Sequence, residues 1–193
     1  MKFFVNFLSV FRIFAAFAIV PLLMEQMFAP AFSAFVLASV SDWLDGFLAR
    51  RYSVATKIGG VIDHIGDKFL VANALVMLVM FLQIWYVIVP AILMICRELY
   101  VSGLREFLGT QKIEMPVPKS RFSFGKIKAF AQMISISAMM LWIWAVNADW
   151  SSEFLTYELL WASIGGLWLA LVCSLVSAAQ YTAAFVGKLK KIK

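Results

Sequence analysis

The stretch from Ser41 to Lys68 reads SDWLDGFLARRYSVATKIGGVIDHIGDK and carries four carboxylates in largely apolar surroundings. We read it as two helices joined by a short basic turn. Asp42 and Asp45 then lie three residues apart on the first helix, and the second carries Asp63 and Asp67 at a spacing of four. Both spacings keep a pair on one helix face. Two divalent cations would balance four anions in a low-dielectric site, and hard oxygen ligands suit Mg²⁺, Mn²⁺ or Ca²⁺.

The composition is that of an integral membrane protein. Of the 193 residues, 63% are apolar and only 15% are charged, whereas an ordinary globular domain is roughly half apolar. An apolar helix of about 20 residues crosses a bilayer, so the chain has room for about six spans with short loops. We therefore predict an all-α integral membrane protein with six transmembrane helices.

Polar and charged loops divide the chain into these helices. The first helix is too long for the apolar region of a signal peptide, and we expect it to be retained. The predicted spans are Phe3–Met24, Pro30–Arg51, Gly59–Leu82, Val87–Phe107, Phe124–Val146 and a sixth that ends near Val186.

Lysine and arginine are distributed as membrane topology requires. If the spans alternate across the bilayer, all 17 Lys and Arg residues fall on one side, and four acids fall on the other: Glu25, Asp149, Glu153 and Glu158. By the positive-inside rule the basic side is the cytoplasm, so we predict that both termini and the carboxylates face it. We attribute the net charge of +6 to orientation and to binding of anionic membrane lipids, and expect no nucleic-acid partner.

Small residues and an arginine accompany the acids. Gly46 and Ala49 follow those of the first helix and Gly59 precedes those of the second, so both helices present bare backbone to a ligand. Arg50 stands at the mouth and suits a phosphate oxygen. Together these features describe a diphosphate site. The alternative is that the aspartates only form ion pairs with neighbouring basic residues, but that would not require the regular spacing.

The same positions carry a family resemblance. Asp42-x-x-Asp45-Gly46-x-x-Ala49-Arg50, eight further residues and Gly59-x-x-x-Asp63-x-x-x-Asp67 match the signature of the CDP-alcohol phosphotransferase family at all eight of its positions. Its members are helical transmembrane enzymes, typically homodimers, that displace CMP from a CDP-linked donor with the hydroxyl of an acceptor alcohol. The resemblance implies an enzyme, a single transmembrane catalytic domain over residues 1–193, and a homodimer.

The resemblance also implies roles for individual residues. Asp42, Asp45 and Asp63 would ligate the metal, and Asp67 would be a further ligand and the general base. The implied cofactor is Mg²⁺ or Mn²⁺, as two ions. The implied CDP-binding pocket comprises Asn6, Ser9, Gly46, Ala49, Arg50 and Gly59.

A second set of basic residues points to the acceptor. Arg97 and Arg105 lie eight residues apart, close to two helical turns, and so share roughly one helix face. Lys126 and Lys128 open the next helix across the intervening loop. Four cations around one cavity favour an anionic acceptor that carries a phosphate. The alternative is that they only follow the positive-inside rule.

This second set also resembles bacterial phosphatidylglycerophosphate synthases. The similarity rests on Arg97-Glu98 with Ser102-Gly103-Leu104-Arg105, on Gly125-Lys126-Ile127-Lys128 with Gln132, and on Asn6, Ser9 and Arg12. It implies, in a bacterial cell membrane, transfer of the phosphatidyl group from CDP-diacylglycerol to glycerol-3-phosphate, which gives phosphatidylglycerophosphate and CMP. Ala129 stands where a Thr is usual and His64 where a Pro is common; neither departure touches the signature.

Three other functions stay open. Within the family, the chain could be a cardiolipin synthase, whose acceptor is phosphatidylglycerol, or a phosphatidylinositol-phosphate synthase. From another class, a divalent-cation or proton-coupled transporter would use the four acids as a pathway. A transporter is expected to spread its acids over the membrane depth and over several helices, whereas these acids lie at the cytoplasmic ends of two.

Overall fold

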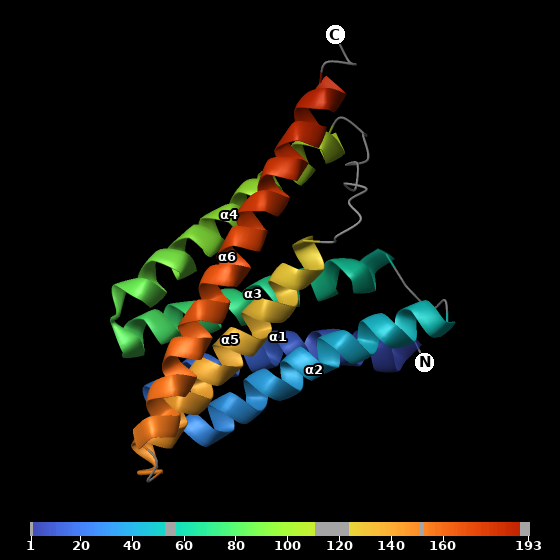
Figure 1. Cartoon of the computed structure of the whole chain (residues 1–193). Helices are drawn as coiled ribbons and strands as arrows, with labels where there is room; N and C mark the ends of the chain where they lie inside the picture. Colours follow the sequence, from blue (N-terminus) through green and yellow to red (C-terminus); the bar gives the residue numbers. More distant parts are fainter. Residues whose placement is uncertain (1, 53–56, 111–123, 151–152, 190–193) are drawn as a thin grey trace.

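A computed structural model describes the backbone of residues 2–52, 57–110, 124–150 and 153–189. Side chains are described for residues 7–42, 44, 60–62, 64–110, 124–150 and 157–188. Every regular element in these ranges is an α-helix (Figure 1). The helices are α1 (Lys2–Met24), α2 (Phe28–Tyr52), α3 (Lys57–Leu82), α4 (Trp85–Thr110), α5 (Phe124–Asn147) and α6 (Glu153–Leu189).

The predicted all-α fold is confirmed, and the helix ends lie within three residues of their expected positions. Among the described side chains, five helices are long and apolar enough to cross a membrane. In α2, which has 25 residues, the apolar segment among these side chains is Phe28–Asp42. This helix begins at Phe28 and not at Pro30, which still lies in the first turn, where a missing N–H costs no helical hydrogen bond.

Tight turns join α1 to α2 and α3 to α4 at one end of the molecule, where α5 also ends (Figure 1). A non-glycine residue with positive φ follows each of these helices: Gln26 at 59°, Gln83 at 49° and Asp149 at 50°. After α1, the N–H of Met27 donates to the carbonyl oxygen of Leu22 over 2.8 Å, the bond that closes a Schellman motif. The left-handed backbone conformation thus ends these helices abruptly. After α1 and after α3, the next helix therefore begins within a few residues and runs in the opposite direction.

The helices alternate in direction, so the starts of α1, α3 and α5 and the ends of α2, α4 and α6 lie away from these turns (Figure 1). α1 packs on α2 and α3, and α5 packs on α6 and α2. α4 packs chiefly on α6. Toward the end of α6, the α4–α6 pair diverges from α1, α2 and α3 (Figure 1).

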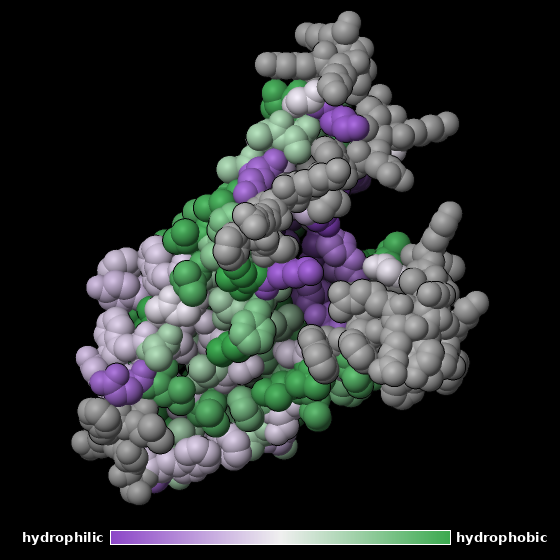
Figure 2. Space-filling view, turned by 45° about the vertical axis from the view of Figure 1, so that its right-hand side comes forward, coloured by the Kyte–Doolittle hydropathy of each residue, from purple (hydrophilic) through white to green (hydrophobic). Residues whose placement is uncertain are grey.

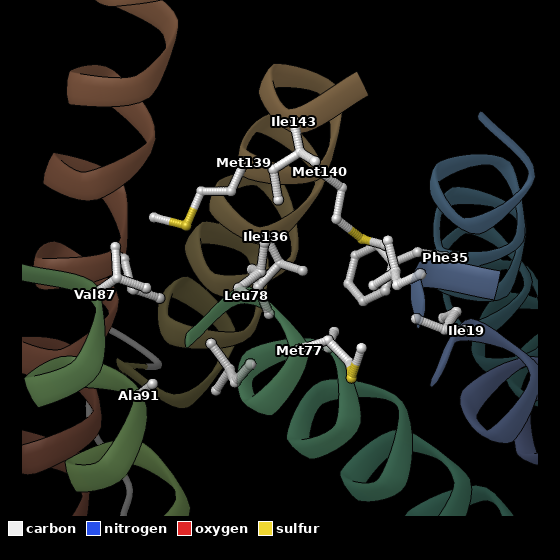
Figure 3. Packing of buried hydrophobic residues seen from close by; sticks show 14 of the residues in the cluster. Ile19, Phe35, Met77, Leu78, Val87, Ala91, Ile136, Met139, Met140 and Ile143 are labelled. Carbon is white, nitrogen blue, oxygen red and sulfur yellow. The ribbon is translucent and has the colours of Figure 1, made fainter. Parts of the chain in front are cut away.

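An apolar core joins the helices between these two ends (Figure 3). Each helix from α1 to α5 contributes a side chain that is at most 1% exposed: Ile19, Phe35, Leu78, Ala91 and Met139. Lipid tails are as apolar as these side chains, so close packing and not exclusion from water holds such helices together. The core fixes the positions of the helices, and so also the positions of the polar side chains that these helices carry at the end away from the turns.

Aromatic side chains gather at the turn end. Trp85 and Tyr86 stack with ring centroids 3.7 Å apart, and Tyr86 lies edge-on to Trp161 at 5.7 Å. The indole N–H of Trp168 donates to the carbonyl oxygen of Tyr86 over 2.9 Å. Such amphipathic rings are typical of a membrane–water interface.

Candidate active site

α3 approaches α1 very closely at Gly66, the residue before Asp67. A Cβ atom on Gly66 would lie 3.2 Å from Cγ1 of Ile13 and 3.5 Å from the carbonyl oxygen of Ser9. Further along α3, the side-chain amide of Asn73 donates to a backbone oxygen of α1 over 2.8 Å. These contacts hold Asp67 beside α1.

Arg12 on α1 joins this contact to α2. Its side chain is 0% exposed, and Nη1 lies 3.0 Å from Oδ1 of Asp42. The Cβ atom of Arg12 would lie 3.7 Å from a Cβ atom placed on Gly66. Asp42 of α2 and Asp67 of α3 are therefore both brought to the same turn of α1. A charged group buried this deeply requires a counter-charge, which Asp42 supplies.

A buried cationic cluster lies across α4, α5 and α6. The side chain of Arg97 is 9% exposed; its Nε donates to the carbonyl oxygen of Ser174 and its Nη2 to Oγ of Ser177, each over 3.0 Å. Its Nη1 lies 2.9 Å from Oε1 of Glu98. The same carboxylate oxygen accepts from the ammonium group of Lys128 on α5. One oxygen thus joins two cations from two helices, α4 and α5, that both pack on α6.

Lys68 links this cluster to the aspartates. It follows Asp67 on α3, and its ammonium group donates to Oγ of Ser102 on α4. Because α4 also carries Arg97, this hydrogen bond joins α3, at the residue after Asp67, to the helix of the cationic cluster.

The remaining predicted cations lie toward the surface. Nη2 of Arg105 donates to the hydroxyl of Tyr181 on α6 over 3.2 Å, and its Cζ lies 5.2 Å from the centre of that ring. Lys126 is exposed two residues before Lys128, so the two lysines project from different sides of α5. Figure 2 shows hydrophilic residues gathered in a hollow where the α4–α6 pair separates from the other helices.

Part of the predicted site falls outside the described side chains. These residues are Asn6, Asp45, Gly46, Ala49, Arg50, Gly59 and Asp63. Ser9, predicted for the nucleotide pocket, is 2% exposed and belongs to the contact between α1 and α3. Of the four predicted metal ligands, the structure describes the side chains of Asp42 and Asp67.

Comparison with known protein families shows to which family the chain belongs. A family model described as CDP-alcohol phosphatidyltransferase matches residues 3–176, which run from α1 into α6. The chain belongs to the CDP-alcohol phosphatidyltransferase family. The resemblance read from the signature between Asp42 and Asp67 is confirmed.

Curated members of this family resemble the chain over most of its length. A protein of Salmonella choleraesuis is 36% identical over 188 residues, 94% of each chain. One of Pectobacterium atrosepticum is 33% identical over 90% of each chain. One of Escherichia coli K12 is 39% identical over 67% of this chain and 72% of its own. Each is named CDP-diacylglycerol–glycerol-3-phosphate 3-phosphatidyltransferase.

CDP-alcohol phosphatidyltransferases generally depend on a metal ion, and the described donors fit one. Asp42 and Asp67 offer the hard carboxylate oxygens that Mg²⁺ and Mn²⁺ prefer, and both side chains are partly exposed. Arg12 orients Asp42 as an outer partner of a metal ligand does. Among the described side chains, no three acidic, His or Cys residues lie close enough together to hold a metal ion. Asp45 and Asp63 are not among these side chains.

Several members of the site were not predicted from the sequence. Arg12 entered only through the family resemblance, although a lone charge within an apolar helix is itself a sign of function. Glu98 and Lys68 received no role, although both accompany predicted residues within apolar segments. Gly66 offered no comparable signal, because its importance depends on the distance between α1 and α3.

Proposed function

We propose that this protein transfers the phosphatidyl group from CDP-diacylglycerol to glycerol-3-phosphate, giving phosphatidylglycerophosphate and CMP for phospholipid biosynthesis. The name of the relatives describes this reaction, and one of them aligns with 94% of the chain. The observation that carries the proposal is the buried pair of cations Arg97 and Lys128, to which α3 is joined by the hydrogen bond from Lys68, the residue after Asp67, to Ser102 of α4. A carboxylate beside a cationic site suits an acceptor that bears both a hydroxyl and a phosphate.

The donor would be held where α1, α2 and α3 meet. When bound, two Mg²⁺ or Mn²⁺ ions on Asp42, Asp45, Asp63 and Asp67 would neutralise the diphosphate and the leaving CMP. The diacylglycerol chains would stay in the bilayer. The nucleotide would lie against Asn6, Ser9, Gly46, Ala49, Arg50 and Gly59.

Asp67 would act as the general base of the reaction. Its carboxylate takes the proton from a hydroxyl of glycerol-3-phosphate as the hydroxyl oxygen attacks. That oxygen forms a bond to the phosphorus that carries diacylglycerol, and the bond from this phosphorus to the oxygen of CMP breaks. CMP leaves with the bonding electrons, and water later removes the proton from Asp67. No covalent intermediate with the protein is required.

Arg97, Lys128 and Arg105 would bind the acceptor phosphate, with Lys126 at the edge of the site. Arg97 suits this role because a guanidinium has more N–H donors than the three contacts to the protein use. Tyr181 restrains the exposed Arg105 through a hydrogen bond and a cation–π contact. Loss of Arg105 should therefore raise the KM for the acceptor more than it lowers kcat.

We further propose a cytoplasmic active site with both termini on the same side, supported by the positive-inside rule. The chain would act as a single transmembrane catalytic domain over residues 1–193 and as a homodimer. Light scattering of the protein in detergent, corrected for bound detergent, tests the homodimer; a monomer mass at the concentration of the activity assay would contradict it.

The reaction is tested by CMP release from CDP-diacylglycerol by the purified protein in detergent, with Mg²⁺ or Mn²⁺ and with the acceptor varied. We expect release with glycerol-3-phosphate, loss of release with EDTA, and a fall of about 100-fold or more in Asp67→Asn. Glu106→Gln is the matched control, because it removes an exposed carboxylate of α4 that lies outside the site.

The acceptor series separates the alternatives. Release only with phosphatidylglycerol or only with an inositol phosphate would keep the family and overturn the proposed acceptor. Release with no alcohol, together with no thermal stabilisation by CMP or CDP and metal, would contradict the proposed reaction and favour a transporter.

A further inference from the structure

We propose that the carboxylate of Glu98 is an internal counter-anion that occupies the acceptor-phosphate site and is displaced by the phosphate of the acceptor. The inference rests on the proposed function. In the structure, Oε1 of Glu98 accepts from both Arg97 and Lys128. This is the arrangement in which one phosphate oxygen would meet the same two cations.

Arg97 does not need Glu98 to hold its position. Its guanidinium is anchored to α6 through the carbonyl oxygen of Ser174 and the hydroxyl of Ser177, each 3.0 Å away. Removal of the Glu98 carboxylate therefore leaves a cation still aimed at the site. If the Glu98 carboxylate served only to position Arg97, it would repeat what these two hydrogen bonds already do.

Glu98 is also placed to leave. Its side chain is 27% exposed, whereas Arg97 and Lys128 are 9% and 11% exposed at their side chains. The two cations are confined by α4, α5 and α6, but the carboxylate lies at the open edge of the cluster. A phosphate dianion brings more charge than one carboxylate, and Glu98 can turn toward water when the phosphate takes its place.

Such an anion is useful whenever no acceptor is bound. Arg97 of α4 and Lys128 of α5 are buried cations that meet at one carboxylate oxygen, and without a counter-charge they would repel each other in a low-dielectric environment. Glu98 compensates them between turnovers. The acceptor must break two charge-assisted hydrogen bonds, so Glu98 weakens acceptor binding by a fixed factor.

The test is equilibrium binding of inorganic phosphate, and separately of glycerol-3-phosphate, to the purified full chain in detergent with CMP and Mg²⁺. In Glu98→Gln the neutral amide holds the cations less strongly, so we expect the Kd for phosphate to fall by about fivefold or more. Phosphate should also raise the Tm of this variant more than that of the wild type. Glu106→Gln removes the same charge from the same helix and should leave the Kd unchanged.

Glu98→Asp keeps the charge but is one methylene shorter, so it cannot reach both cations; its Kd for phosphate should also fall, by a smaller factor. This variant decides the matter if Glu98→Gln does not fold. An unchanged or higher Kd for phosphate in the folded variants would overturn the proposal and leave Glu98 a structural partner of Lys128. Because inorganic phosphate is the probe, this result does not depend on CMP release, whose absence would instead contradict the proposed function.

Discussion

Among single residues, Gly66 positions Asp67 because it has no side chain. In Gly66→Ala the new Cβ would lie 3.2 Å from Cγ1 of Ile13, tighter than an ordinary contact, so α3 must move away from α1. We expect a loss of about 1–2 kcal/mol in unfolding free energy. CMP release should fall by about tenfold or more, because Asp67 moves with the helix. Denaturation followed by circular dichroism and the release assay measure the two effects.

Gly103→Ala on α4 is the control, since a Cβ there meets nothing within 4 Å. It should leave stability unchanged or raise it by up to about 1 kcal/mol through helix propensity. Ile13→Ala combined with Gly66→Ala should recover part of the activity by opening the gap. Equal behaviour of Gly66→Ala and Gly103→Ala would show that the close approach is unimportant.

Arg12 joins α1 to α2 through its ion pair with Asp42. Arg12→Met removes a fully buried guanidinium and leaves Asp42 without its contact at 3.0 Å. We expect the unfolding free energy to fall by about 2–3 kcal/mol. This loss is smaller than is usual for a fully buried ion pair, because Asp42 is partly exposed to solvent. Arg12→Lys, which keeps the charge, should recover part of this loss. A Met variant as stable as the wild type would contradict a structural ion pair between α1 and α2.

At the scale of the elements, the turns between helices carry a local cost. Gln83 ends α3 with φ at 49°, a conformation that favours glycine. Gln83→Gly should raise the unfolding free energy by about 0.5–1 kcal/mol, and the weak bond from its side chain to the carbonyl oxygen of Met80 at 3.3 Å should be little missed. Gln83→Val, with a branched side chain, should lower it. Lower stability in the glycine variant would contradict this account of the turn.

The helices themselves follow from apolar length and from the polar breaks between them, which is why their number and approximate ends could be predicted. The pairing of the helices could not. α4 packs chiefly on α6, and α1 on both α2 and α3, and these choices depend on small residues and side-chain shapes at each interface. Arg97 illustrates the consequence, because its partners Ser174 and Ser177 lie on a helix distant in sequence.

For the whole molecule, the distribution of charge predicts orientation. We expect Gln26→Cys, in the turn after α1, to react with a membrane-impermeant maleimide in intact cells. Lys188→Cys, near the end of α6, should react only after permeabilisation, because that end should face the cytoplasm. Both are made in a variant with Cys96 and Cys173 replaced by Ala, which provides the unlabelled control. The reverse labelling pattern would contradict the proposed cytoplasmic site.

The sequence by itself determined the helical membrane class, the approximate helices, and the signature from Asp42 to Asp67 that identifies the family. These properties are local: apolar length sets a span, and helical periodicity sets which aspartates share a face. Only the tertiary structure decided that α1 and α3 approach closely at Gly66, that Arg12 pairs with Asp42, and that Glu98 binds both Arg97 and Lys128. Such pairs depend on how close two helices come and how each is rotated about its axis, and many side chains along the chain set both together.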